Sequence, residues 1–153
     1  MIELQAISEE KLDIYLERTW REYREDIIKA GISSVQADIN VEQAKSSSLE
    51  NGKLKPNQYV FDVISDGNSI GFLWLVHRSE ISEGNWFISE IELLEEFRGK
   101  GLGRATMIAA EEFIKDHGGQ SIGLNVFGFN AAARKLYDSL DYQVLATQMK
   151  KTL

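Results

Sequence analysis

The sequence predicts an α/β fold, a mixed and strongly twisted sheet of six to seven strands with helices on both faces. Segments with alternating apolar residues interleave with segments of helical spacing, in the order β-α-α-β-β-β-α-β-α-β. One helical segment joins the strand that begins at Asn85 to the strand that begins at Ser121, and such a connection makes the two strands parallel through a right-handed crossover. A glycine-rich loop precedes that helix, so it lies where ligands bind in parallel sheets, at the carboxyl end of a strand.

The N-terminal third is predicted to form one strand and two helices. Residues 2–7 alternate in polarity, as strands do. Ser8 is a suitable N-cap, and apolar residues then recur at three-and-four spacing until Gly31, a natural helix end. A more polar helical pattern covers residues 35–49 and ends at Asn51-Gly52.

The remaining elements follow from turn signals and periodicity. Two runs rich in β-branched and aromatic residues, 59–65 and 69–76, flank Asp66-Gly67-Asn68 and predict a hairpin. After them we expect a strand at 85–94, a helix from Leu102 to His117, a strand at 121–127, a helix at 130–140 and a final strand at 142–149.

Composition limits the function classes. A chain of 153 residues predicts one domain, 1–153, and it has no cysteine, which excludes disulfides, thiolate metal sites and a covalent cysteine intermediate. The two histidines lie far apart in sequence, and we expect no metal. The net charge of −7 argues against a nucleic-acid partner. No apolar run approaches the roughly 20 residues of a membrane helix and no signal peptide is evident, so we expect a cytoplasmic protein without a membrane partner.

The loop Arg98–Arg104, called the glycine loop below, has the features of a phosphate-binding site. Gly99, Gly101 and Gly103 occupy alternate positions, and the loop also holds three cations and no acid. A helix begins within the loop, where N–H groups lack acceptors and the dipole end is positive. The spacing fits neither common nucleotide motif. A dinucleotide fingerprint would need glycine at position 104, and a P-loop would need Ser or Thr after Lys100.

The pattern Arg98-x-x-Gly101-x-Gly103, placed between a strand and a helix, resembles the coenzyme A pyrophosphate loop of the GNAT superfamily of N-acetyltransferases. A second pattern downstream, Asn130-x-x-Ala133-x-x-Leu136-Tyr137, is similar to another signature of that superfamily. The part of the chain from the glycine loop to the last residue is similar to small bacterial acetyltransferases of unassigned substrate. Asp141 stands where the family often has glycine, at a left-handed helix end, at a cost of about 1 kcal/mol.

The resemblance implies a set of roles. The main chain at Ile91 and Leu93 would pair with the pantetheine arm of acetyl-CoA, and Tyr137 would protonate the departing thiolate. A core tyrosine with a satisfied hydroxyl is the alternative for Tyr137. The implied coenzyme-binding residues are Ile91, Leu93, Arg98, Gly99, Lys100, Gly101, Leu102, Gly103, Arg104, Asn130 and Ala133.

The expected reaction is direct attack by a primary amine, on a small molecule or a peptide, on acetyl-CoA in a ternary complex. The absence of cysteine favours this route. Glu90 and Glu92 share one strand face and are candidate bases, although a solvent-facing strand edge explains them equally well. Two alternatives stay open for the whole chain: a non-catalytic acyl-CoA-binding or sensing domain, and a general nucleotide-binding domain. The resemblance also leaves a homodimer open.

Overall fold

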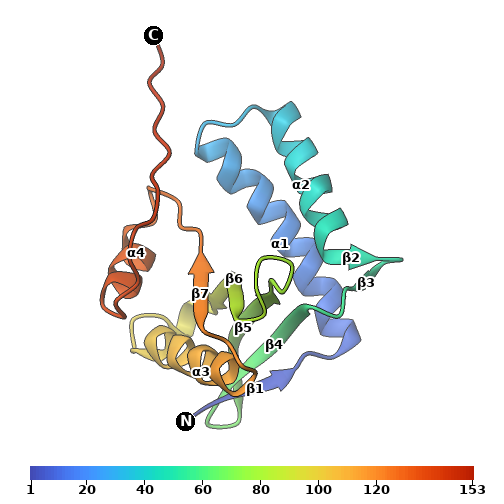
Figure 1. Cartoon of the computed structure of the whole chain (residues 1–153), viewed down its shortest axis with the longest axis vertical. Coiled ribbons are helices and arrows are strands. Elements are labelled where there is room, and N and C mark those ends of the chain that lie inside the picture. Colours follow the sequence, from blue (N-terminus) through green and yellow to red (C-terminus); the bar gives the residue numbers. More distant parts are fainter.

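The computed structural model describes all 153 residues, and a five-stranded mixed sheet forms its centre (Figure 1). Its order is β1-β4-β5-β6-β7. The neighbouring pairs from β1 to β6 are antiparallel, whereas β6 and β7 are parallel, as the crossover predicts. The strands are β1 (Ile2–Ala6), β4 (Gln58–Ser65), β5 (Asn68–His77), β6 (Asn85–Leu93) and β7 (Ser121–Leu124).

Helix α1 (Glu9–Lys29) covers one face of this sheet, and α2 (Ser34–Ser48) packs beside it (Figure 1). Ser8 caps α1 by accepting a hydrogen bond from the Lys11 N–H, as the sequence predicts. Tyr15 of α1 stacks on Phe72 and is buried together with Trp74 of the sheet. The amphipathic pattern of α1 therefore buries its apolar stripe against the sheet.

The opposite face carries the larger core, under α3 (Leu102–Asp116) and α4 (Ala131–Asp138). A short 3-10 helix, η1 (Glu95–Phe97), leads from β6 toward α3. Met107 and Ile114 of α3 are fully buried against the sheet, and Tyr137 of α4 joins the same cluster. Helices on both faces of a mixed sheet confirm the predicted fold class.

A β-bulge at Ser89 changes which side chains of β6 face which layer. Trp74 of β5 lies opposite Glu90, but its neighbour Leu75 lies opposite Ile88, so Ser89 has no partner on β5. Ile88 faces α3, and because of the extra residue Glu90 faces α1. A regular strand would place residues 88 and 90 on the same face.

Three local predictions were wrong. Asn51-Gly52 does not simply end a helix: it is the turn of a small hairpin of β2 (Leu49–Glu50) and β3 (Lys53–Leu54). Both turn residues have positive φ, as a type I′ turn requires. The expected final strand at 142–149 does not form, since this segment pairs with no strand of the sheet, and β7 ends at Leu124, earlier than expected. The chain after Tyr142 instead leaves the body as an extended segment (Figure 1).

None of the helices combines the length and the apolar character that crossing a membrane requires.

Candidate active site

The glycine loop needs glycine at two of its three glycine positions. Gly99 and Gly101 have φ of 71° and 77°, in the left-handed region that glycine adopts without strain, and Gly101 is the N-cap of α3. A Cβ at either position would meet no atom within 4 Å, so the loop surface is open. Gly103 lies within α3 and a Cβ there would make ordinary contacts with Leu136 and Leu93.

Six consecutive main-chain N–H groups of this loop have no acceptor within the protein. They run from Gly99 to Arg104, and neither a carbonyl nor a side chain accepts a hydrogen bond from any of them. Three of them belong to the first turn of α3, where the helix dipole is positive. Unpaired N–H groups around left-handed glycines form a concave site for an anion.

The three cations of the loop are held by main-chain oxygens. The Arg98 Nε donates to the Leu93 carbonyl at 2.8 Å, and the Lys100 Nζ donates to the Glu96 carbonyl at 2.7 Å. Arg104 reaches the end of α4, where its guanidinium donates to the carbonyl and the hydroxyl of Ser139. Arg104 therefore joins α3 to α4, a contact that the sequence did not predict.

A gap opens between the two parallel strands directly before this loop. Pairing of β6 with β7 ends at Ile88 and Leu124, while β6 continues to Leu93. The stretch that includes Ile91 and Leu93 is thus paired with β5 on one side only. The main-chain groups along its other side are available to an extended ligand, although the Leu93 carbonyl already accepts from Arg98.

Helix α4 borders the same region. Asn130 caps it by accepting a hydrogen bond from the Ala133 N–H at 3.1 Å, and Ala133 is half-buried against the larger core. Tyr137, one turn further on, is buried, and burial alone raises the pKa of its phenol. Its hydroxyl is therefore protonated at neutral pH.

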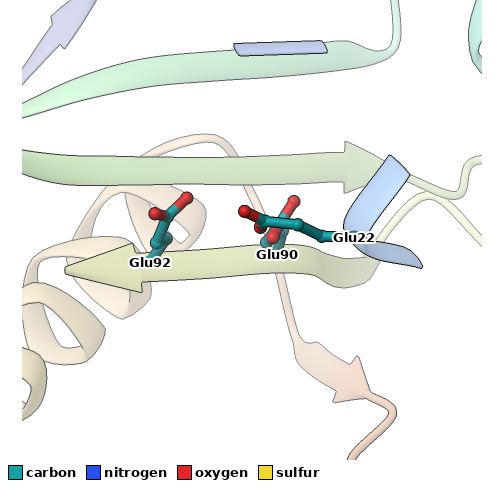
Figure 2. Close-up of side chains that lie close together, drawn as sticks. All are labelled: Glu22, Glu90 and Glu92. Atoms are coloured by element: carbon teal, nitrogen blue, oxygen red, sulfur yellow. The ribbon is translucent and has the colours of Figure 1, made fainter. Parts of the chain in front are cut away.

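Glu90 and Glu92 project from β6 toward α1, and Glu22 of α1 reaches toward them (Figure 2). Carboxylate oxygens of the three residues lie within 4.8 Å of one another. Arg18 donates to Glu92 at 2.6 Å, and the Tyr15 hydroxyl donates to Glu90 at 3.0 Å. The two predicted acids do share one face, and that face lies under α1 and not at a solvent-facing edge.

Burial raises the pKa of both strand carboxyls. For Glu90 the hydrogen bond from Tyr15 opposes this effect, whereas the neighbouring carboxylates reinforce it. For Glu92 the charge of Arg18 opposes it. A carboxylate with a raised pKa is a better proton acceptor than an exposed one, so the cluster has the properties of a general base. The same spacing would suit a cation, but Arg18 already supplies positive charge to the cluster.

Sequence reasoning missed the α1 residues of this cluster, Tyr15, Arg18 and Glu22. The helical spacing placed Tyr15 on the buried face of α1, but about 75 residues separate α1 from β6, and no local pattern indicates that pairing.

The family of the chain follows from comparison with known proteins. The family model described as acetyltransferase (GNAT) family matches residues 15–142, which include the glycine loop, the gap and α4. The chain belongs to the GNAT acetyltransferases. Its homologues are N-acetyltransferases, so this member is an acyltransferase as well.

Two relatives of this GNAT acetyltransferase come from Bacillus subtilis (strain 168). The uncharacterized N-acetyltransferase YycN is 28% identical over 154 residues, covering 99% of each chain, and YdgE is 28% identical over 152 residues, covering 98% of this chain and 97% of YdgE. The crystal structure of YycN superposes with a TM-score of 0.90 over 100% of this chain and 99% of its own. The Thermoplasma acidophilum N-acetyltransferase PaiA, solved in complex with coenzyme A, shares the fold at 19% identity, with a TM-score of 0.64 over 97% and 93% of the chains.

Proposed function

We propose that this acetyltransferase uses acetyl-CoA as its co-substrate and transfers the acetyl group to a primary amine. The observation that carries the proposal is the row of six unpaired N–H groups from Gly99 to Arg104, at the start of α3. A pyrophosphate provides several oxygen acceptors at this scale, and helix N-termini bind phosphates for that reason. The coenzyme A in the PaiA complex supports the assignment.

The unpaired side of β6 is the proposed binding site for the pantetheine arm of the coenzyme. Main-chain groups near Ile91 and Leu93 would pair with the pantetheine arm as an added strand does, and Asn130 would hydrogen-bond to the same arm across the gap. A main-chain N–H of β6 would polarise the thioester carbonyl and stabilise the oxyanion. Ala133 leaves room beside α4 for the coenzyme.

The chemistry needs one base and one acid. Glu90 or Glu92, directly or through water, would take the proton of the ammonium, and the neutral amine nitrogen would then form a bond to the carbonyl carbon. Cleavage of the carbon–sulfur bond follows, Tyr137 would give its proton to the leaving sulfur, and the extra proton on the attacking nitrogen would return to the tyrosinate through water. The products are an amide and the free thiol of coenzyme A. Holding the two substrates together supplies several kcal/mol of rate enhancement.

The test of the coenzyme site compares two glycine variants. Gly101→Asp adds bulk and negative charge beside the bound phosphates, and calorimetry should show at least about tenfold weaker coenzyme A binding. Gly67→Asp is the matched control: this glycine also has φ of 77° and open space at its Cβ, but it lies in the β4–β5 turn. Unchanged affinity in Gly101→Asp, or an equal loss of affinity in Gly67→Asp, would refute the binding of the coenzyme A pyrophosphate by the glycine loop.

Release of free thiol from acetyl-CoA, measured with a panel of primary amines, tests the transfer reaction. Thiol release that depends on the amine supports catalysis. Tight coenzyme binding without release with any amine would instead support the acyl-CoA-sensing alternative. Stabilisation by ATP or NAD but not by coenzyme A, in a thermal-shift comparison, would support the nucleotide-binding alternative.

A further inference from the structure

One stripe of α1 faces the two carboxyls of β6. Its members follow the helical spacing i, i+3, i+4 and i+7, which places them on one side of the helix: Tyr15, Arg18, Thr19 and Glu22. Tyr15 and Arg18 each have a partner on β6 and so belong to the candidate base. Thr19 and Glu22 form no side-chain hydrogen bond, although Figure 2 shows Glu22 pointing to the acids of β6. The proposed base explains neither of these two residues.

Thr19 keeps an unpaired hydroxyl in the interior of the protein. The residue is 7% exposed, and its Oγ1 has no hydrogen-bond partner. This hydroxyl faces the Glu90 carboxyl and the Tyr15 hydroxyl, which already bond to each other. A buried hydroxyl without a partner lowers stability, and an apolar side chain of similar shape would avoid that loss. The Thr19 oxygen is therefore available to a hydrogen-bond donor that binds between α1 and β6.

The charges beside this hydroxyl do not balance. Three carboxylates lie together, those of Glu22, Glu90 and Glu92, and Arg18 is the one cation that pairs with them. Its guanidinium bonds to Glu92, whereas its Nε lies 3.9 Å from Glu22 and donates to no atom. Three negative charges and one positive charge give the ionised group a net charge of −2. A partly buried group with surplus negative charge attracts cations and repels anions.

We propose, on the basis of the proposed function, that Thr19 and Glu22 determine acceptor specificity and that the preferred acceptor is a primary amine with a second positive charge. The acceptor ammonium supplies one positive charge, which leaves the group at −1. Transfer of its proton to Glu90 or Glu92 does not change this total. A second cation on the acceptor balances it, and Glu22 meets that cation, since its side chain is 45% exposed against 17% for Glu92. Thr19 accepts a hydrogen bond from the reacting amine, and an acceptor that carries a carboxylate is repelled.

Amines of one length that differ in the charge of the far end test this preference: 1,5-diaminopentane, 5-aminopentan-1-ol and 5-aminopentanoate. We expect kcat/KM for thiol release to be at least about tenfold higher for the diamine than for the amino alcohol, and lowest for the amino acid. The preference should weaken as salt is added, because salt screens the second charge. Dipeptide amides with lysine, norleucine or glutamate in the second position repeat the comparison, and the series that shows the preference identifies the acceptor as a small amine or a peptide N-terminus.

Two variants assign the preference to α1. Glu22→Gln keeps the shape of the side chain but not its charge, and the ratio of kcat/KM between the diamine and the amino alcohol should fall to near one. Glu17→Gln is the matched control, because Glu17 is an exposed glutamate of the same helix outside the cluster, and it should keep the wild-type ratio. Thr19→Val should raise KM for every amine by about threefold or more without lowering Tm, which separates binding from folding.

The outcomes that overturn this inference differ from those that overturn the proposed function. Equal kcat/KM for the three charge types, in both series, would overturn the inference while acetyl transfer itself stands. A preference that survives Glu22→Gln, or that Glu17→Gln removes as well, would overturn the role of Glu22. Unchanged KM in Thr19→Val would overturn that of Thr19. If no amine releases thiol, the proposed function fails and the inference fails with it.

Discussion

At the scale of single residues, the two carboxyls of β6 show how environment decides chemistry. Glu90 and Glu92 are chemically identical and two positions apart, but only Glu92 has a direct cationic partner, Arg18. Glu90 has a neutral donor, the Tyr15 hydroxyl, whose own pKa is raised by burial and by the adjacent carboxylate. Glu90 is therefore the better candidate for a base that must gain and lose a proton during turnover.

The pH dependence of activity should report this base. Only the ionised carboxylate accepts a proton, so kcat/KM should rise with pH through the pKa of the cluster, which burial places above the ~4.3 of an exposed glutamate. The titratable groups that face Glu90 are Tyr15, Arg18 and Glu22 from α1 and Glu92 from β6. The double variant Glu90→Gln with Glu92→Gln should lose that rise. An unshifted profile would eliminate both residues as the base.

Tyr137→Phe should lower kcat by about 10²-fold or more, since general acid catalysis contributes 10²–10⁴-fold, and should leave coenzyme affinity unchanged. Tyr142→Phe is the matched control, because its ring lies 5.8 Å from that of Tyr137 but its hydroxyl bonds to Glu111. Full turnover by Tyr137→Phe would show that Tyr137 is a core residue and not the acid. Steady-state kinetics of thiol release together with calorimetry separate the two effects.

At the scale of elements, the capping of α4 links stability to the coenzyme site. Asn130→Ala removes the acceptor of the Ala133 N–H and should lower the free energy of unfolding by about 1 kcal/mol, measured by urea denaturation. Asn130→Asp keeps a capping oxygen and should cost only a few tenths as much, but it places a negative charge beside the coenzyme. A role for Asn130 toward pantetheine therefore predicts weaker coenzyme A binding in both variants. Normal binding in both would leave Asn130 as a helix cap alone.

The sequence predicted elements whose signals are local. Ser8 and Asn130 cap their helices, Asp66-Gly67-Asn68 turns between β4 and β5, and the glycine loop begins α3. It failed where structure depends on a distant partner. The segment 142–149 has the composition of a strand but pairs with no strand of the sheet, and the two-residue strands around Asn51-Gly52 are too short to show alternation. The pairing of α1 with Glu90 and Glu92 has no local signature at all, and the functional roles of the site residues stay predictions.

At the scale of the whole molecule, a charged contact joins the α1 layer to the sheet. The Lys11 ammonium of α1 pairs with Asp62, a buried residue of β4 that also accepts from the Ser69 hydroxyl. Asp62 faces the same side of the sheet as the Glu90 cluster, so this contact also fixes α1 over the candidate base.

Lys11→Met keeps the length of the side chain but leaves Asp62 without its cation. We expect a loss of about 1–3 kcal/mol in the free energy of unfolding, the range for a buried group that loses its partner. Lys45→Met is the control, because Lys45 pairs with Glu42 on the exposed surface of α2, where such pairs contribute about 0–1 kcal/mol. Equal losses in the two variants, measured by urea denaturation, would show that the Asp62 pair does not hold the layers together.

The extra residue in β6 divides the strand into two halves whose side chains meet different layers. Before Ser89, Trp86 and Ile88 belong to the α3 core. After it, the even positions, Glu90 and Glu92, meet α1, while the odd positions stay with the core. Substitutions at positions 90 and 92 therefore change the face under α1 without repacking the hydrophobic interior. Deleting Ser89 would remove the bulge and join Ile88 directly to Glu90, and because Leu75 and Trp74 already lie opposite these two residues, both acids would stay on the α1 face.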